Sequence, residues 1–178
     1  MKVITPPDLI RSAEEIIEVY RVLTPDLSPE KKGGYLTVGL DCMTSTFVSP
    51  VGTYDPAKEE KYKELSGEKA DRLYANWARD HSSVSSYQSK NPSVGKYGQW
   101  GGSVLFARRA PSVIKHGTRL TCDIVSFSGL PELGDEAVSF VLGFRLELGS
   151  GNYDELAKQI IGVSGNPSLR DLFNAFKS

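Results

Sequence analysis

Long apolar runs are missing from this sequence, and cysteine and histidine are scarce, with two residues of each. No stretch approaches the ~18 consecutive apolar residues that span a bilayer, and residues 1–7 lack the apolar core of a signal peptide. We therefore expect a cytosolic protein with no membrane association. The cysteines and histidines show no recognisable zinc-binding spacing, so we assign no metal site and expect reduced, packed thiols.

The remaining composition is that of an ordinary globular domain. The 178 residues include 39% hydrophobic and 24% charged residues, and the net charge is -1. These values exclude collagen-like, coiled-coil, disulfide-scaffold and wholly disordered proteins. A chain of this length corresponds to one domain, or to one domain with an appendage.

Acidic residues are missing between Asp80 and Asp123. Fifteen cations and all 22 acids lie outside this interval, so the near-neutral total conceals a basic middle in an acidic chain. This region would attract an anion such as phosphate or a propionate, unless folding interleaves its cations with acids from other segments. Nucleic acid is disfavoured, because no helix-turn-helix or RRM signature is present. The cations of the interval are Lys90, Lys96, Arg108, Arg109, Lys115 and Arg119.

The first half of the chain shows clear helical and strand patterns. Apolar residues recur at spacings of three and four over residues 6–23, which predicts a helix. β-branched and aromatic runs predict strands over 35–41 and 46–51, and Pro50 places the second strand at an edge. Helical spacing returns over residues 56–81.

A long irregular segment is predicted over residues 81–102, and loops of this length are usually functional or mobile. Two further strands are predicted over 104–108 and 119–127, and two short helices over 152–161 and 168–176. The aromatic side chains of the irregular segment suit a flat ligand, with core packing as the alternative. They belong to Tyr87, Tyr97 and Trp100.

The sequence Ser128–Pro131 predicts a corner at which a strand ends and a helix follows. Gly129 carries no Cβ atom that would strain a turn, and Pro131 ends strand pairing. Asp135 is expected to cap the following helix, whose first N–H groups can face an anion. A plain connection is the alternative interpretation of the same residues.

Three segments together resemble the GlcG/HbpS-like family, which includes the C-terminal domain of PduO. The first is the helix over 6–23 that leads into the strand TVGLD. The second is the helix from Glu68 that ends in the sequence DHSS at residues 80–83. The third is GGS at 101–103, followed by two strands and the sequence SFSGLPELGDEA that begins at Ser126. The order and approximate spacing agree over about residues 6–148.

The resemblance implies an α/β fold, a profilin-like sandwich in which a mainly antiparallel sheet is covered by helices. Residues 1–148 would form this domain, and residues 149–178 would form a short C-terminal helical extension with no counterpart in the family. Apolar residues alternate over 135–148 as in a strand, whereas the resemblance implies a helix there. We predict the helix.

The resemblance also implies function, namely a cytosolic homo-oligomer that binds a small anionic ligand such as haem or a related tetrapyrrole. His81 would be the axial ligand, and Lys96 or Arg108 would pair with carboxylates. This sequence differs from the family pattern in two places. Asp123 stands where the family often has glycine, and the loop over 108–118 is longer than usual. The other candidate cofactor-binding residues are Ser82, Ser83, Gly101, Gly102, Ser128 and Gly129.

Two other classes of function remain open. The second hypothesis is a non-enzymatic assembly or adaptor protein that holds no cofactor. A small-molecule enzyme would use His81 to activate Ser82 or Ser128, but no third residue that orients the histidine is visible. We therefore assign no catalytic residue and favour a protein that is not an enzyme.

Overall fold

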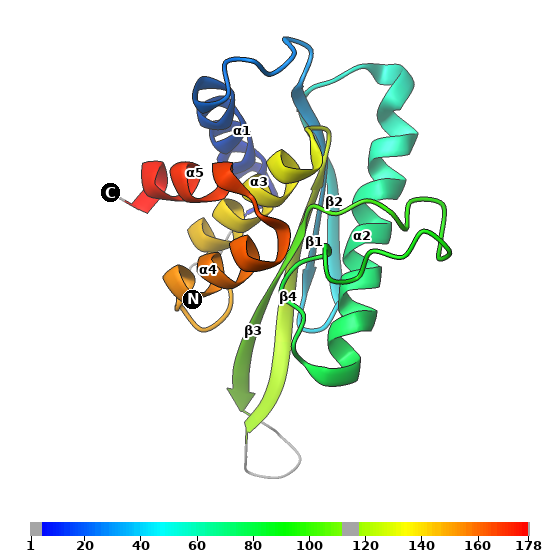
Figure 1. The fold of residues 1–178 in the computed structure, drawn as a ribbon, viewed down its shortest axis with the longest axis vertical. Coiled ribbons are helices and arrows are strands. Elements are labelled where there is room, and N and C mark those ends of the chain that lie inside the picture. Colours follow the sequence, from blue (N-terminus) through cyan, green and yellow to red (C-terminus); the bar gives the residue numbers. More distant parts are fainter. Residues whose placement is uncertain (1–4, 112–117, 178) are drawn as a thin grey trace.

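A four-stranded antiparallel sheet with the strand order β2-β1-β4-β3 forms the centre of the molecule (Figure 1). The computed structural model describes residues 5–111 and 118–177. It confirms an α/β fold in which an antiparallel sheet is covered by helices. β2 lies at one edge, as Pro50 predicts. The strands are β1 (Lys32–Leu40), β2 (Ser45–Thr53), β3 (Ser103–Pro111) and β4 (Thr118–Ser128).

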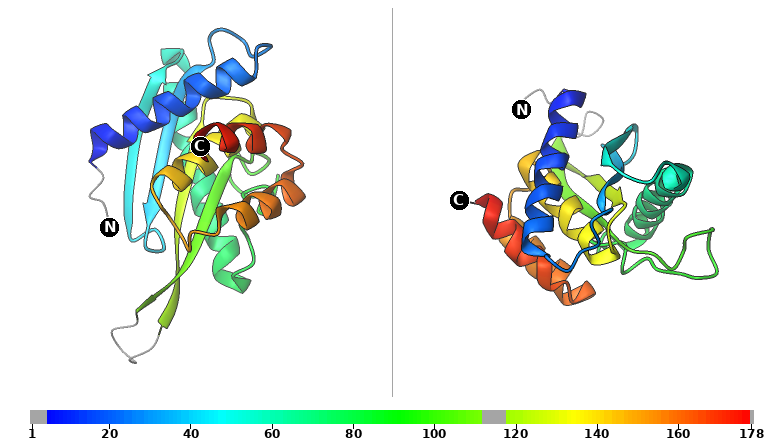
Figure 2. Two further views of the ribbon diagram at one scale, coloured as in Figure 1. Left: turned by 90° about the vertical axis from the view of Figure 1, so that its left-hand side faces the viewer. Right: turned by 90° about the horizontal axis from the view of Figure 1, so that it is seen from above.

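The helices lie in layers on both faces of the sheet (Figure 2). α2 packs on β1, β4 and β3 from one side, while α1 and α3 cover the other side and α5 packs on α3. A short 3-10 turn at Pro56–Lys58 precedes α2. The helices are α1 (Pro6–Leu23), α2 (Glu59–Asp80), α3 (Glu132–Arg145), α4 (Tyr153–Ser164) and α5 (Pro167–Lys177).

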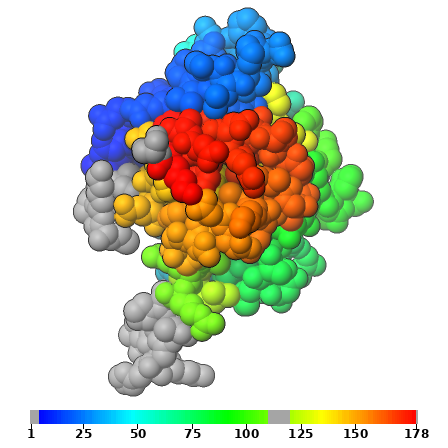
Figure 3. All heavy atoms as spheres, turned by 60° about the vertical axis from the view of Figure 1, so that its left-hand side comes forward, coloured from blue at the N-terminus to red at the C-terminus, as the bar shows by residue number. Residues whose placement is uncertain are grey.

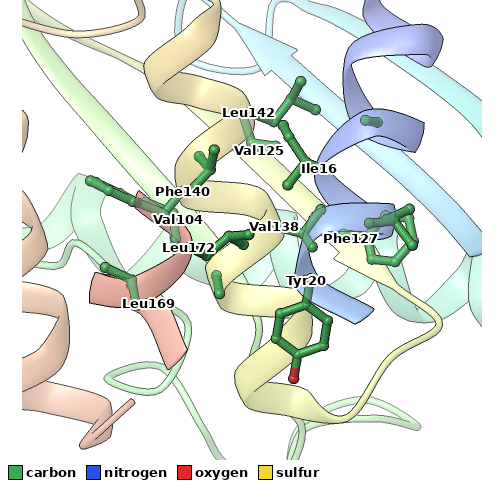
Figure 4. Packing of buried hydrophobic residues seen from close by; sticks show 14 of the residues in the cluster. Ile16, Tyr20, Val104, Val125, Phe127, Val138, Phe140, Leu142, Leu169 and Leu172 are labelled. Atoms are coloured by element: carbon green, nitrogen blue, oxygen red, sulfur yellow. The ribbon is translucent and has the colours of Figure 1, made fainter. Parts of the chain in front are cut away.

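The main hydrophobic core lies between the sheet and the layer formed by α1, α3 and α5. Side chains of these three helices point toward one another and toward the strands (Figure 4). α5 contributes Leu169, Leu172 and Phe173, which are 0%, 0% and 3% exposed. Figure 3 shows α4 and α5 lying against the rest of the molecule beside α1. The helices of residues 149–178 therefore complete the core of the domain.

A smaller core fills the space between α2 and the opposite face of the sheet. Ala70, Leu73 and Trp77 of α2 pack there with Leu105 of β3 and with β4. Gly67 does not interrupt the helix that contains these residues. None of the helices within the described ranges is long and apolar enough to cross a membrane.

α3 confirms the helix predicted near residues 135–148, against the alternating pattern. Each residue from Gly134 to Gly143 is buried, because α3 is covered by the sheet, α1 and α5 together. A helix that is buried on all sides has no polar face, so its sequence loses the 3.6-residue period. The predicted irregular segment before β3 is also confirmed, whereas the connection through residues 112–117 lies outside the described part of the chain.

Candidate functional site

The chain turns from β4 into α3 at Ser128–Pro131, where the sequence predicts a corner. The last residue of β4, Ser128, pairs with Tyr35 of β1. A Cβ atom on Gly129 would lie 2.2 Å from the carbonyl oxygen of Gly33. Glycine is therefore required here because the corner touches the backbone of β1, and not because of a left-handed φ.

A buried ion pair lies beneath this corner. Lys69 Nζ lies 3.0 Å from Asp135 Oδ2, and the two side chains are 0% and 4% exposed. Lys69 also donates a hydrogen bond to the carbonyl oxygen of Phe127. Asp135 Oδ1 accepts hydrogen bonds from the backbone N–H groups of Gly129 and Leu130 at 3.2 and 2.9 Å. Buried charges persist when they are paired and hydrogen-bonded in this way.

The prediction that Asp135 caps α3 is wrong. Pro131 occupies the N-cap position, and no side chain caps the helix there. Asp135 lies in the first turn, where its own N–H group bonds to the carbonyl oxygen of Pro131 at 2.9 Å. Its carboxylate is drawn inward by the ammonium group of Lys69 and accepts the N–H groups of the corner. Those groups are therefore occupied from within the protein.

Burial opposes the charge on both members of the pair. It raises the pKa of Asp135 to about 6, although the Lys69 charge and the backbone N–H groups act in the opposite direction. Burial likewise lowers the pKa of Lys69, against the attraction of Asp135. Each charge is therefore maintained by its partner and by hydrogen bonds, against the cost of burial.

Gly102 packs directly against the ion pair. Its φ of +116° lies outside the range that other residues readily adopt, and an added Cβ atom would lie 2.6 Å from Asp135 Cβ and 2.9 Å from Lys69 Nζ. The hydroxyl of Ser139 bonds to the carbonyl oxygen of Gly102 at 2.9 Å and accepts the N–H group of Phe127 at 3.0 Å. The start of β3 is thereby fixed to α3 and to the end of β4.

A pocket of about 210 Å³ opens beside the corner, and we call it the corner pocket. The first turns of α2 form one wall, and the corner residues with Trp100 and Gly101 form another. Three lysines from two segments contribute to its lining. The full lining is Lys31, Lys58, Lys61, Tyr62, Leu65, Trp100, Gly101, Ser128, Gly129, Leu130, Glu132 and Asp135.

The lining acids already have cationic partners outside the pocket lining. Glu132 pairs with Lys90 at 2.8 Å and accepts the N–H group of Gly101. Asp135 is bonded to Lys69, as described above. The three lining lysines therefore leave the corner pocket with an excess of positive charge, which favours an anion.

The lining lysines are engaged only weakly by their neighbours. Lys31 Nζ is 3.4 Å from the hydroxyl of Tyr62. Lys58 lies 3.7 Å from Asp55 in an exposed pair, and such pairs contribute little. Lys61 Nζ lies 5.9 Å from the centroid of the Trp100 ring. These ammonium groups thus retain donors that a ligand in the pocket can use.

Ser128 carries a hydroxyl that has no hydrogen-bond partner in the described part of the protein. The residue is 1% exposed and lines the corner pocket. Buried hydroxyl groups are normally hydrogen-bonded, so each exception requires an explanation. Ser128 belongs to the lining of a pocket with three lysines, which provides one, because an oxygen of a bound anion can accept a hydrogen bond from the hydroxyl.

The structure brings together three of the predicted site residues and places a fourth beside them. Gly101, Ser128 and Gly129 line the corner pocket, and Gly102 lies behind them against the ion pair. Trp100, expected as an aromatic contact for a ligand, also lines it. The guanidinium group of Arg72 donates a hydrogen bond to the carbonyl oxygen of Trp100 and so fixes this part of the pocket lining.

The other predicted site residues lie elsewhere. His81 ends α2 in a left-handed conformation, and its ring centroid is 4.5 Å from that of Trp77. Ser82 bonds to Asp80, and Ser83 accepts a hydrogen bond from Asn76. None of these residues lines the corner pocket.

Three cations of the basic interval pair with acids outside it, whereas Lys115 lies outside the described part of the chain. Lys96 pairs with Glu64 at 2.9 Å, and Arg108 pairs with Asp123 at 3.5 Å. Lys90 pairs with Glu132 of α3. The positive charge of the corner pocket therefore comes from lysines outside this interval.

A haem with His81 as its axial ligand does not fit the corner pocket. Lys61 and His81 lie near opposite ends of α2, about 30 Å apart at ~1.5 Å per helical residue. The pocket volume of about 210 Å³ is also below the ~300 Å³ at which pockets for drug-sized ligands begin. Haem binding remains a prediction from the resemblance, without support from this site.

The sequence contained one unused signal for the lining lysines. Lys58, Lys61, Tyr62 and Leu65 follow the spacing i, i+3, i+4 and i+7, which places them on one helical face. Mixed charges around them obscured this face, and Lys31 comes from a loop that no pattern connects with α2. Lys63, between them in sequence, does not line the pocket.

No group of three or more His, Cys, Asp or Glu side chains that could hold a metal ion occurs within residues 5–111 and 118–177. The resemblance to the GlcG/HbpS-like family rests on the sequence segments alone. Comparison of the chain with family models, curated proteins and solved structures gave no match to any of them.

Proposed function

We propose that this protein binds a small molecule with a carboxylate or phosphate group in the corner pocket. The observation that carries the proposal is the Ser128 hydroxyl, which is buried without a partner among the described residues and belongs to a residue that lines the same pocket as three lysines. Leaving a buried polar group unsatisfied costs about 1–3 kcal/mol. A bound anion would remove that cost by accepting a hydrogen bond from the hydroxyl.

The lining also restricts the kind of anion. The volume of about 210 Å³ favours a compact molecule, and Tyr62, Leu65 and Trp100 offer apolar contact to its carbon skeleton. Ammonium groups bind carboxylate and phosphate oxygens through charge-assisted hydrogen bonds. A small organic anion meets both requirements. We further propose that the protein is cytosolic, as its composition predicts, and a homo-oligomer, as the resemblance to the GlcG/HbpS-like family implies.

The first experiment uses the fluorescence of Trp100, which is 38% exposed. The buried Trp77 is replaced by Phe, so that Trp100 is the one tryptophan left in the chain. This protein is titrated with benzoate, phenyl phosphate and inorganic phosphate, and with benzamide as a neutral control. We expect a saturable change with at least one anion and none with benzamide, and calorimetry on the unsubstituted protein should give the same affinity.

The second experiment compares two lysines on the same helix. Lys61→Gln removes a charge from the corner pocket, whereas Lys63→Gln removes one two residues away, outside the lining. Loss of a charge-assisted contact should weaken anion binding about tenfold in the first variant. The second should bind within about twofold of the unsubstituted protein, since a distant exposed charge is screened.

Two results would overturn the proposal. One is the absence of a saturable response to all three anions, which would favour the assembly or adaptor function instead. The other is equal weakening by Lys61→Gln and Lys63→Gln, which would indicate attraction to general surface charge and no defined pocket.

A further inference from the structure

The sulfur atoms of Cys42 and Cys122 lie 3.9 Å apart at the opposite end of β1 and β4 from the corner pocket. Cys42 lies in the turn after β1, and its N–H group donates to the carbonyl oxygen of Cys122 at 2.7 Å. Both residues are free cysteines. We propose that this pair is a site of reversible disulfide formation, oxidised by a low-molecular-weight disulfide such as glutathione disulfide.

The two sulfurs are close enough to bond after a small local movement. A disulfide bond is about 2.05 Å long, so the sulfurs must approach each other by about 1.9 Å. Rotation of the side chains and a small shift of the turn are sufficient for a movement of this size. The existing backbone hydrogen bond already holds the two chain segments side by side.

The turn that carries Cys42 is strained. Asp41, Cys42 and Met43 have φ values of 45°, 59° and 63°, so three successive residues other than glycine are left-handed. Such residues cost free energy and persist where the surroundings hold them. Here the holding contacts come from β4, because Asp123 accepts the N–H group of Asp41 at 2.9 Å and Thr121 donates to Asp41 at 2.7 Å. A disulfide would add a covalent link at the same place.

Hydrogen bonding orients the thiols for this reaction. Thr121 has a single hydroxyl proton, which it donates to Asp41, so at 3.3 Å it accepts the S–H group of Cys42. The S–H group of Cys122 points at the sulfur of Cys42. Cys122 is thus aimed at the atom that it would attack.

The two cysteines differ in access, which sets the order of events. Cys42 is partly exposed and Cys122 is 0% exposed, so the oxidant meets Cys42 first. Burial also raises the pKa of the Cys122 thiol, and a neutral thiol is unreactive toward the oxidant. Cys122 therefore acts in the second step.

The exchange balances in two displacements. The thiolate of Cys42 attacks one sulfur of glutathione disulfide, and one glutathione thiolate leaves. Cys122 then gives up its proton and attacks the Cys42 sulfur, expelling the second glutathione thiolate. Two protein thiols are oxidised to one disulfide, one glutathione disulfide is reduced to two thiols, and the two protons end on those thiols.

The test treats the full-length protein with glutathione disulfide and measures its intact mass and its peptides. We expect the loss of two hydrogen atoms and a cross-linked pair of peptides, both reversed by dithiothreitol. The link closes a loop of 80 residues. Constraining a loop of that length in the unfolded chain should raise Tm by about 12 °C.

Two variants identify the steps. Cys122→Ala should stop at a mixed disulfide that holds one glutathione on Cys42, and Cys42→Ser should take up none. If Cys122→Ala does not fold, prior alkylation of the accessible thiol in the unsubstituted protein serves instead and should block cross-linking. No mass change in excess glutathione disulfide would overturn the proposal, as would a lasting mixed disulfide or a cross-link between two chains.

Discussion

The ammonium nitrogen of Lys69 lies 3.0 Å from a carboxylate oxygen of Asp135, inside the protein. Lys69 belongs to α2 on one face of the sheet, and Asp135 belongs to α3 on the other face (Figure 2). One ion pair therefore joins the two helix layers at the end of the sheet. Because Asp135 also lines the corner pocket, the stability of the domain and the shape of the pocket depend on the same pair.

Replacement of Lys69 by Met should destabilise the protein by about 3–5 kcal/mol, because Asp135 would be left as an unpaired buried charge. Urea denaturation measures this loss. Lys61→Met, which removes an exposed lysine of the same helix, should change stability by less than about 0.5 kcal/mol. The double variant Lys69→Met/Asp135→Asn should be more stable than Lys69→Met alone, and a double variant of lower stability would contradict the prediction.

The contribution of Asp135 to stability should depend on pH with a defined sign. Its pKa is about 6 in the folded protein, against ~3.9 in an unfolded chain, so the folded state holds the proton to a higher pH. The resulting stabilisation is complete below about pH 3.9 and is lost as the pH rises through about 6.

The variant Asp135→Asn lacks this titration and serves as the reference. The free energy of unfolding of the unsubstituted protein, relative to that of the variant, should fall by about 2 kcal/mol between pH 4 and pH 7. Urea denaturation at four pH values in this range measures the difference. A difference that is constant or that grows with pH would show that the folded pKa is not raised.

Two serines of β4 should respond differently to replacement by alanine. Ser128 has a buried hydroxyl with no partner among residues 5–111 and 118–177, so Ser128→Ala should leave stability unchanged or increase it by about 1 kcal/mol. Ser126 donates to the carbonyl oxygen of Ser66 at 2.6 Å and accepts from Ser103 at 2.7 Å. Ser126→Ala should therefore cost about 1–3 kcal/mol.

The same two variants separate stability from binding. Ser128→Ala should weaken the binding of whichever anion gives a saturable change in Trp100 fluorescence, since it removes a hydrogen-bond donor from the corner pocket. Destabilisation by Ser128→Ala of the same size as by Ser126→Ala would mean that the Ser128 hydroxyl has a partner inside the protein.

Two glycines provide a further matched comparison. Gly102→Ala should destabilise the protein by more than about 3 kcal/mol, because its φ is +116° and its Cβ atom would collide with Asp135. Gly67 lies inside α2 with open space at its Cβ position. Gly67→Ala should therefore stabilise the protein by about 0.5–1 kcal/mol. Thermal unfolding of both variants measures the contrast, and equal effects would contradict it.

Much of the secondary structure could be predicted because it depends on local pattern. The helix predicted over residues 6–23 has those bounds in the structure, and all four strands were placed within a few residues of their ends. α3 is the instructive exception, since its complete burial removed the polar positions that mark a helical period. A family resemblance, and not periodicity, led to the right prediction there.

Prediction of the site was partial for a different reason. Turn chemistry identified Ser128 and Gly129, because a corner has requirements that are local in sequence. It did not identify Lys31 or Lys61 as their neighbours. Lys31 approaches the corner through the pairing of β1 with β4, and Lys61 approaches it through the packing of α2 on the sheet. The assignment of Arg108 to ligand carboxylates overlooked Asp123, its partner within the fold.

The amino-acid sequence alone determined which segments become helices and strands and where β4 must turn, since backbone preferences and apolar spacing act over a few residues. Only the tertiary structure decided which charges are neutralised and which face the corner pocket. Lys69 and Asp135 are 66 positions apart, and neither segment indicates the other residue as a partner. Their pairing depends on two helices that meet from opposite faces of one sheet. Local sequence patterns do not indicate which residues of such distant segments come into contact.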